Sequence, residues 1–264
     1  MPRINVGNLS LNYQEKGEGP VILFIPGMMG LLDAWKFQLN DFCNRFRCIS
    51  FDHRGTGESD KPADAYSTAL VAQDAIALLD TLKIDEAHVV GTSTGGCVLQ
   101  TMAIDHPDRL LSCVLNNTWT KADEYIRRVQ SSRMRIAKSY GPEAYVEFSS
   151  LWTCGPLQFR YDWEELQSLE ARQKQTIAPV DVLVNRLQMS LDHDRTSELH
   201  KIETKTLVVG TRDDTTVPSY FAEDLHKAIK GSQVFIMESG GHYSYRYNAP
   251  EFNRVLGDFL ANVG

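Results

Sequence analysis

The sequence lacks several features that would place it outside the class of globular, water-soluble proteins. It contains no run of roughly 18 apolar residues, so no membrane-spanning helix is predicted. Its first residues do not include the apolar stretch of roughly 7–15 residues that marks a secretory signal peptide. The 5 cysteines are scattered and without C-x-x-C spacing, which is typical of reduced thiols. Together these absences predict a cytoplasmic protein without disulfides.

The charge and metal-ligand patterns exclude further classes. The 264 residues carry 27 Lys and Arg against 34 Asp and Glu, a net charge of -7, and they show no basic stripe. A nucleic-acid partner is therefore not expected. No His, Cys and Asp cluster has the spacing of a metal site, and Gly55-Thr56-Gly57 lacks the other residues of a phosphate-binding loop. We expect no cofactor and no metal, a small molecule as the partner, and either a monomer or a homodimer.

The sequence instead shows an alternation of apolar runs and amphipathic stretches. Strands are predicted at residues 4–6, 9–13, 21–25, 47–51, 88–91, 111–115, 206–209 and 233–237. Helices are predicted at residues 32–46, 69–82, 97–103, 219–229 and 250–262. The first two strands form an antiparallel edge pair, and the alternation that follows implies right-handed βαβ units. The predicted fold is α/β, with a doubly wound and mostly parallel sheet of eight strands.

The alternation stops between the sixth and seventh predicted strands. This part of the chain contains no clear buried strand and instead has successive helical runs at Glu124–Lys138, Pro142–Leu151, Glu164–Gln175 and Asp181–Leu191. We therefore predict a helical cap inserted after strand six. The predicted division is a core made of residues 1–117 and 201–264, with residues 118–200 as the cap.

The segment His88–Gly96 has the pattern around which the other motifs can be arranged. Its apolar strand ends in G-T-S-T-G and is followed by a helix-compatible run. A strand, a sharp turn and a helix form the context that the G-x-S-x-G nucleophile elbow requires. The turn strains the backbone of its middle residue and makes that side chain project, while the glycines allow close packing. Ser93 is the predicted nucleophile.

A serine hydroxyl needs a base within hydrogen-bond reach and a third group that orients the base. Gly240-Gly241-His242 directly follows the last predicted strand, and the two glycines allow the backbone to bring an imidazole over the edge of the sheet. His242 is therefore the predicted general base. The other histidines are interpreted as structural: His53, His88, His106, His193, His200 and His226.

Two adjacent aspartates compete for the orienting acid. Both lie in the loop after the seventh predicted strand, and only one of two neighbouring side chains can point toward the imidazole. Counting four residues back from Pro218 gives Asp214, whereas counting three on from Gly210 gives Asp213. We favour Asp214 and keep Asp213 as the alternative. The other carboxylate is then a turn or helix-cap residue.

Charge that develops on a carbonyl oxygen requires preorganised donors, and backbone N–H groups are sufficient. Thr94, the residue after the nucleophile, offers one N–H at the start of a helix. Met28, in the loop after the third predicted strand, offers the other. These two residues form the predicted oxyanion hole.

Taken together, these motifs resemble those of α/β-hydrolase-fold serine hydrolases. The similarity extends over nearly the whole chain, through G-T-S-T-G, D-H-R-G-T-G-E-S at Asp52–Ser59, D-D-T-T-V-P, and G-G-H followed by Pro250-Glu251-Phe252. One departure is Pro26-Gly27, where many members have His-Gly. This change leaves the backbone donor in place but removes a histidine that often braces the loop. Within the family, the short cap and Asn117-Thr118-Trp119 are similar to 3-oxoadipate enol-lactonases, aminoacrylate hydrolases and small carboxylesterases.

The cap is expected to decide the substrate. The residues predicted to line its pocket are Met29, Trp119, Tyr125, Arg127, Trp152 and Tyr243, with Phe159 as a further aromatic wall. Arg127 or Arg128 would hold a substrate carboxylate, as an enol-lactonase requires. The alternative interpretation is a packed cap core for the aromatic residues and a solvated helix face for the arginines.

The predicted function is hydrolysis of a carboxylic ester or lactone through an acyl-enzyme on Ser93. One alternative keeps the serine and the histidine but cleaves a C–C bond of a vinylogous diketone. A second alternative is a ligand receptor with little or no turnover on the same fold, because fold alone does not prove chemistry.

Overall fold

The computed structural model describes residues 3–64 and 66–263, and its centre is one eight-stranded sheet. The strand order is β1-β2-β4-β3-β5-β6-β7-β8, and only β1–β2 and β2–β4 pair in antiparallel fashion. The strands are β1 (Arg3–Val6), β2 (Leu9–Lys16), β3 (Val21–Ile25), β4 (Arg47–Phe51), β5 (Ala87–Thr92), β6 (Leu110–Asn116), β7 (Thr206–Thr211) and β8 (Gln233–Met237). The predicted mostly parallel eight-stranded sheet is confirmed.

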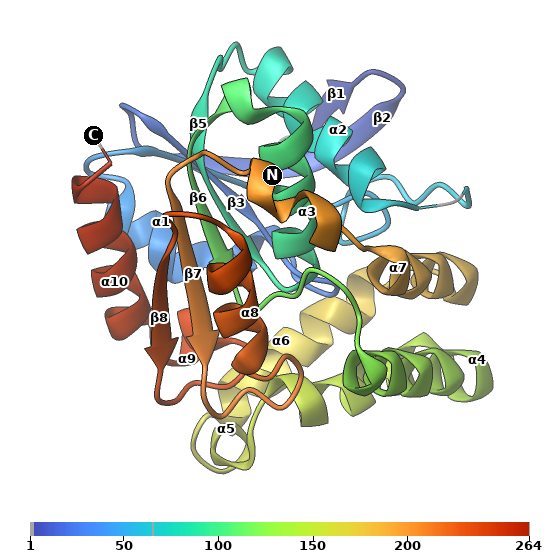
Figure 1. Ribbon diagram of the computed structural model, residues 1–264. Coiled ribbons are helices and arrows are strands. Elements are labelled where there is room, and N and C mark those ends of the chain that lie inside the picture. The colour runs from blue at the N-terminus through green and yellow to red at the C-terminus, as the bar shows by residue number, and fades with distance from the viewer. Residues whose placement is uncertain (1–2, 65, 264) are drawn as a thin grey trace.

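Helices cover both faces of the sheet (Figure 1), which is the doubly wound arrangement that the sequence predicted. On one face α2 (Thr68–Thr81), α3 (Thr94–Asp105) and α8 (Tyr220–Ala228) cover the larger core cluster. On the other face α1 (Lys36–Phe42) and α10 (Ala249–Ala261) cover a smaller cluster. All residues of β3, β5 and β7 are buried, because these central strands are packed on both sides.

Four helices lie between β6 and β7, at the edge of the sheet where the parallel strands end (Figure 1). They are α4 (Glu124–Thr153), α5 (Pro156–Tyr161), α6 (Trp163–Thr176) and α7 (Val180–Asp192). A helical insertion after strand six is thereby confirmed. Two runs that were predicted separately are merged in α4, which bends at Gly141, where φ is 87° and Pro142 follows.

Some helices begin or end at other residues than predicted, because tertiary structure sets these bounds. The helix predicted at residues 32–46 is a short 3-10 turn, Leu32–Trp35, followed by α1, which ends at Phe42. The sequence pattern missed α5 and α9 (Ser244–Tyr247). Helices of four to six residues are too short to show a hydrophobic period, so a pattern-based prediction passes over them.

The structure can be compared with two of the absences predicted from the sequence, those of membrane-spanning helices and of disulfides. Within residues 3–64 and 66–263, no helix is long and apolar enough to cross a membrane. All five cysteines are unpaired, and four of them are buried. Burial raises the pKa of the Cys97 thiol to about 12, which agrees with a packing role for this residue in the helix after the elbow.

His193 links the end of the cap to the core and predicts a pH dependence of stability. Its side chain is buried, and its Nδ1 lies 3.1 Å from Oγ1 of Thr68 on α2. Burial, with a smaller effect of the Arg195 charge, lowers the pKa of His193 from 6.5 to about 4. Between these values the unfolded chain binds a proton that the folded chain does not, so stability decreases as the pH falls from about 6.5 to about 4.

Replacing His193 with glutamine should therefore reduce this loss of stability with falling pH by up to about 1 kcal/mol per pH unit. The measurement is the free energy of unfolding in urea at several values between about pH 4 and pH 7. His200→Gln, at an exposed histidine on the next turn, is the control and should keep the wild-type slope. Equal slopes in wild type and His193→Gln would show that other groups cause the acid dependence.

Candidate active site

Ser93 lies between the end of β5 and the first residue of α3 with a backbone conformation that is rare for a serine. Its φ is 55° and its ψ is -124°, so the chain turns sharply at this residue. Three groups hold the turn: the Ser93 N–H donates to the Asn116 carbonyl at 2.9 Å, and the Ser93 carbonyl accepts from Gly96 N–H at 2.9 Å and Thr118 Oγ1 at 2.7 Å. This is the strand, turn and helix geometry that the G-T-S-T-G motif predicted.

The glycines of the motif are required by backbone contacts. A Cβ on Gly95 would lie 2.4 Å from the carbonyl oxygens of both Ile25 and Pro26, and one on Gly91 would lie 2.5 Å from the Gly95 carbonyl. These neighbours are main-chain atoms of β3, of the loop that follows it and of α3, which cannot move aside without shifting the sheet. The packing therefore presses the elbow against the loop that follows β3.

Replacing Gly95 with alanine should lower the free energy of unfolding by about 3 kcal/mol or more, because the added methyl group overlaps rigid backbone. Urea unfolding measures the effect. Gly257→Ala on α10 is the control: its Cβ would meet nothing closer than Phe42 Cε1 at 3.7 Å. That variant should be as stable as wild type or more stable by about 0.5–1 kcal/mol. A small loss at Gly95 would mean that the elbow can move away from the loop.

His242 and Asp214 form a buried pair on the loops that follow β8 and β7. The His242 Nδ1 lies 2.7 Å from Oδ2 of Asp214, and the side chains are only 4% and 0% exposed. The other oxygen of Asp214 accepts the backbone N–H groups of Thr216 at 2.7 Å and Val217 at 2.9 Å. The carboxylate is thereby fixed toward the imidazole and held as an acceptor.

Asp213 faces a different partner. Its exposed carboxylate accepts the N–H of Gly241 at 2.9 Å and the N–H of Gly240 at 3.2 Å, in the turn just before His242. Gly241 has a φ of 60°. The aspartate that does not contact the imidazole therefore braces the loop that carries it.

Asn117, directly after β6, connects the end of β7 with the segment after β8 that carries His242. It was not predicted as a site residue. Its φ is 42°, and its Nδ2 lies 3.1 Å from Thr211 Oγ1, 3.2 Å from the His242 carbonyl and 3.3 Å from Ser244 Oγ. A polar residue at the end of a parallel strand is the signal that could have revealed it, because strand ends meet at one edge of the sheet. Asn117 positions the histidine loop relative to the elbow.

Met28 lies on the loop after β3, and Thr94 is the residue of the elbow that follows Ser93. Among the described residues, no atom accepts a hydrogen bond from the Met28 N–H, and Thr94 is the first residue of α3, where N–H groups lack partners inside the helix. The buried Arg186 of α7 donates from Nη2 to the Met28 carbonyl at 2.9 Å, which fixes the orientation of this peptide group. Gly27 lies so close that its Cβ would be 3.1 Å from Ser93 Cβ.

The predicted pocket residues fall into two groups. Met29 and Tyr243 flank the site, on the loops after β3 and β8, while the main chain of Trp152 contacts the acid loop by accepting from Thr216 Oγ1. Tyr125 also contacts the acid loop: it is 38% exposed, but its hydroxyl donates to the Thr215 carbonyl at 2.5 Å. The other two lie apart. Trp119 is packed with Cys97 in a separate cluster, and the Arg127 side chain is 45% exposed beside Glu124.

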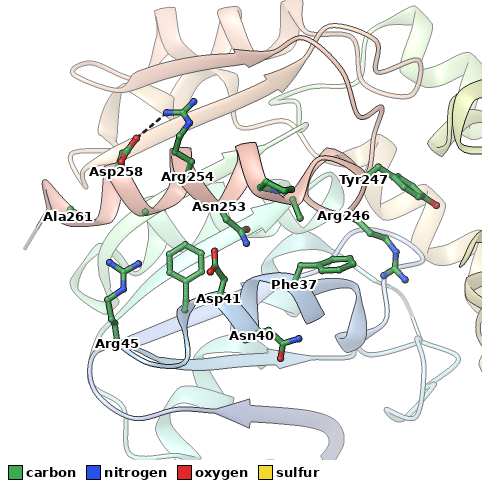
Figure 2. A pocket seen from close by; sticks show the side chains of 14 residues that line it. Phe37, Asn40, Asp41, Arg45, Arg246, Tyr247, Asn253, Arg254, Asp258 and Ala261 are labelled. Carbon is green, nitrogen blue, oxygen red and sulfur yellow. Dashed lines mark hydrogen bonds and ion pairs between the residues drawn. The ribbon is translucent and has the colours of Figure 1, made fainter. Parts of the chain in front are cut away.

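A large surface cavity of about 950 Å³ lies away from these residues, between α1 and α10 (Figure 2). Its walls carry mixed charges, such as Asp41 and Arg45 on one side and an Arg254–Asp258 pair on the other. Neither Ser93, Asp214 nor His242 lines it. Its size therefore does not identify it as the site of the chemistry.

The elbow, the sheet order and the inserted helices define a class of protein. Residues 20–249 match the alpha/beta hydrolase fold family, and the chain belongs to that family. In sequence, it is 31% identical to "Putative carbamate hydrolase RutD" of Azorhizobium caulinodans over 100% of this chain and 99% of the relative. It is 30% identical to the protein of the same name from Caulobacter vibrioides, over 98% of this chain and 99% of the relative.

Solved structures show the same fold at lower identity. The enol-lactonase of Burkholderia xenovorans superposes with a TM-score of 0.90 at 24% identity, over 98% of this chain and 100% of that one. A thermophilic esterase from Thermogutta terrifontis superposes with a TM-score of 0.89 at 22% identity, over 100% and 99%. These similarities establish the fold, and the family establishes a hydrolase.

Proposed function

We propose that this hydrolase cleaves a carboxylic ester or lactone through an acyl-enzyme on Ser93, with His242 as general base and Asp214 as the orienting acid. The observation that carries the proposal is the buried Asp214–His242 pair, 2.7 Å apart, on the loops at the sheet edge where the elbow presents Ser93. A carboxylate on Nδ1 leaves Nε2 of a neutral imidazole free to accept the serine proton. A purely structural pair would not need a strained serine at the same edge of the sheet.

The mechanism follows from these roles. As the Ser93 oxygen attacks the carbonyl carbon, His242 takes the hydroxyl proton and becomes an imidazolium, which the Asp214 carboxylate stabilises. The tetrahedral intermediate then collapses, and the proton passes from His242 to the leaving alcohol oxygen. In the second half, His242 takes a proton from water, the resulting hydroxide attacks the acyl carbon, and the acid leaves as Ser93 regains its proton.

The N–H groups of Met28 and Thr94 serve as the oxyanion hole in this proposal. Each donor of this kind contributes on the order of 10²–10³ in kcat, and the contribution is larger in a site from which water is excluded. Ser93 and His242 are only 6% and 4% exposed, which supports such exclusion. The helices of residues 118–200 cover the site and are proposed to select the substrate.

A carbamate is the second candidate substrate, because two relatives at 30–31% identity carry the name carbamate hydrolase. A carbamate carbonyl presents the same electrophilic carbon and the same developing oxyanion as an ester. Its nitrogen donates electron density to the carbonyl, so attack is slower and requires a better oxyanion hole. Comparison of an ester, a lactone, a carbamate and a dienoate ring-cleavage product under one set of conditions separates these substrates.

The test of the shared chemistry is covalent labelling with a fluorophosphonate, followed by intact mass. Wild type should gain one adduct, and Ser93→Ala should gain none, because only an activated serine displaces the fluoride. An adduct at another residue, or no adduct on folded wild type, would contradict the proposal and favour a receptor with little turnover. Saturable binding of a ligand without product release would support that receptor function.

A further inference from the structure

Arg133 is a buried cation in the middle of α4, on the side of the cap that faces the core. It is 3% exposed, and neutral atoms surround its guanidinium group. Its Nε donates to Ser149 Oγ at 3.1 Å, its Nη1 to Gln130 Oε1 at 3.0 Å, and its Nη2 to Tyr145 Oη at 3.0 Å. The same Nη2 lies 3.4 Å from the Met29 sulfur.

The other strongly buried arginines are satisfied in a different way. Arg54 pairs with Asp74 at 2.5 Å, and Arg246 pairs with Glu165. Arg186 donates to the main-chain carbonyls of Arg54 and Met28. Among the described residues, no carboxylate oxygen lies within 4.0 Å of the Arg133 guanidinium. A buried charge without a counter-ion is costly. Arg186 also has no carboxylate partner, but it holds two main-chain carbonyls in place, whereas the hydrogen bonds of Arg133 go to neutral side chains.

Arg133 contacts a residue that is adjacent in the chain to the proposed oxyanion hole. The Met29 sulfur that it contacts follows the oxyanion residue Met28 directly in the chain. Burial raises the pKa of the Tyr243 hydroxyl, next to His242, to about 12, and the Arg133 charge acts in the reverse direction. The sulfur contact places the Arg133 guanidinium against the loop after β3, and Gly27 of the same loop packs against Ser93.

We infer that the substrate carries a carboxylate and that Arg133 binds it; this inference rests on the proposed ester or lactone hydrolysis at Ser93. A thioether sulfur is the weakest of the four acceptors around Arg133, and a carboxylate oxygen can replace it without disturbing the other three bonds. The Tyr145 hydroxyl, which shares Nη2, can turn and donate to the same carboxylate. One guanidinium group without a counter-ion matches one negative charge.

The test is a comparison of matched substrates with the purified full chain. One pair places the charge on the acyl side, 4-nitrophenyl hemiglutarate against 4-nitrophenyl hexanoate. The other pair places it on the alcohol side, 4-acetoxybenzoate against 4-methylphenyl acetate. Wild type should prefer the charged member of one pair in kcat/KM by about tenfold or more. In Arg133→Met this charged-to-neutral ratio should fall by about 10- to 100-fold, mostly through KM.

Two further variants separate binding from structure. Arg133→Lys keeps the charge and should restore part of the ratio, whereas Arg135→Met, at an exposed arginine on the same helix, should keep the wild-type ratio. If Arg133→Met does not fold, inhibition of wild type decides: free glutarate should compete with the ester far better than glutaramide does.

The inference about Arg133 would be overturned if wild type had equal kcat/KM for the charged and the neutral ester in both pairs. Equal inhibition by glutarate and glutaramide would also overturn it. So would a loss in Arg133→Met that is the same for charged and neutral esters and leaves KM unchanged. Failure of the proposed function gives a different result, namely no hydrolysis of any of the four esters and no adduct at Ser93 with the fluorophosphonate.

Discussion

Alanine in place of Ser93 is expected to lower kcat by about 10⁶-fold on the best ester or lactone substrate, because the acyl-enzyme cannot form. The remaining rate should come from substrate positioning and the oxyanion donors, and it should exceed the rate in water by roughly 10³–10⁴-fold. Steady-state kinetics with enough enzyme to detect single turnovers measures both quantities. The KM should change little, since the substitution removes an atom that acts mainly after binding.

The fold should tolerate this substitution. Serine and alanine experience the same backbone strain at a φ of 55°, and the hydrogen bonds that hold the turn use main-chain atoms of Ser93. The free energy of unfolding should therefore remain within about 0.5 kcal/mol of wild type. Ser239→Ala, at an exposed serine in the loop after β8, is the matched control and should keep full activity. Turnover that persists in Ser93→Ala would instead indicate direct attack by water.

The sequence was most informative where one short segment determines the structure. The apolar run of β3 and the G-T-S-T-G turn depend on neighbours within a few residues, so pattern and motif predicted both. The turn at Ser93 could be predicted for the same reason: a strained turn that requires glycines leaves a distinct signal in sequence. For the acid, the sequence favoured Asp214 but kept Asp213 as the alternative, because one rotation of the loop exchanges two adjacent side chains.

The sequence could not predict residues whose role depends on packing between distant elements. Arg133 lies on a polar helix, and its burial arises only when α4 folds over the loop after β3, which is about 100 residues away in the chain. Arg127, which the sequence offered as a carboxylate ligand, lies on the same helix but is 45% exposed at its surface. Asn117 likewise contacts residues roughly 94–127 positions away. No local pattern distinguishes such residues from solvated ones.

Asparagine in place of Asp214 is expected to lower kcat by about 10⁴-fold, whereas the same change at Asp213 should cost less than about tenfold. Asparagine at 214 fits the space of the buried carboxylate, but its amide offers an N–H where the imidazole Nδ1 needs an acceptor, or else provides no negative charge for the imidazolium. At 213 an asparagine oxygen can still accept from Gly241, so the histidine loop keeps most of its support.

The comparison is informative because the two variants change neighbouring residues by the same atoms and remove the same formal charge. A long-range effect of net charge, or a general loosening of the loop after β7, would lower both activities alike. The 2.7 Å contact to His242 and the two N–H groups that hold the Asp214 carboxylate predict a difference of about 10³-fold between the variants. A larger loss in Asp213→Asn would assign the orienting role to that carboxylate. Equal and small losses would mean that the hydrogen bonds of Asn117 to this loop suffice to orient the histidine.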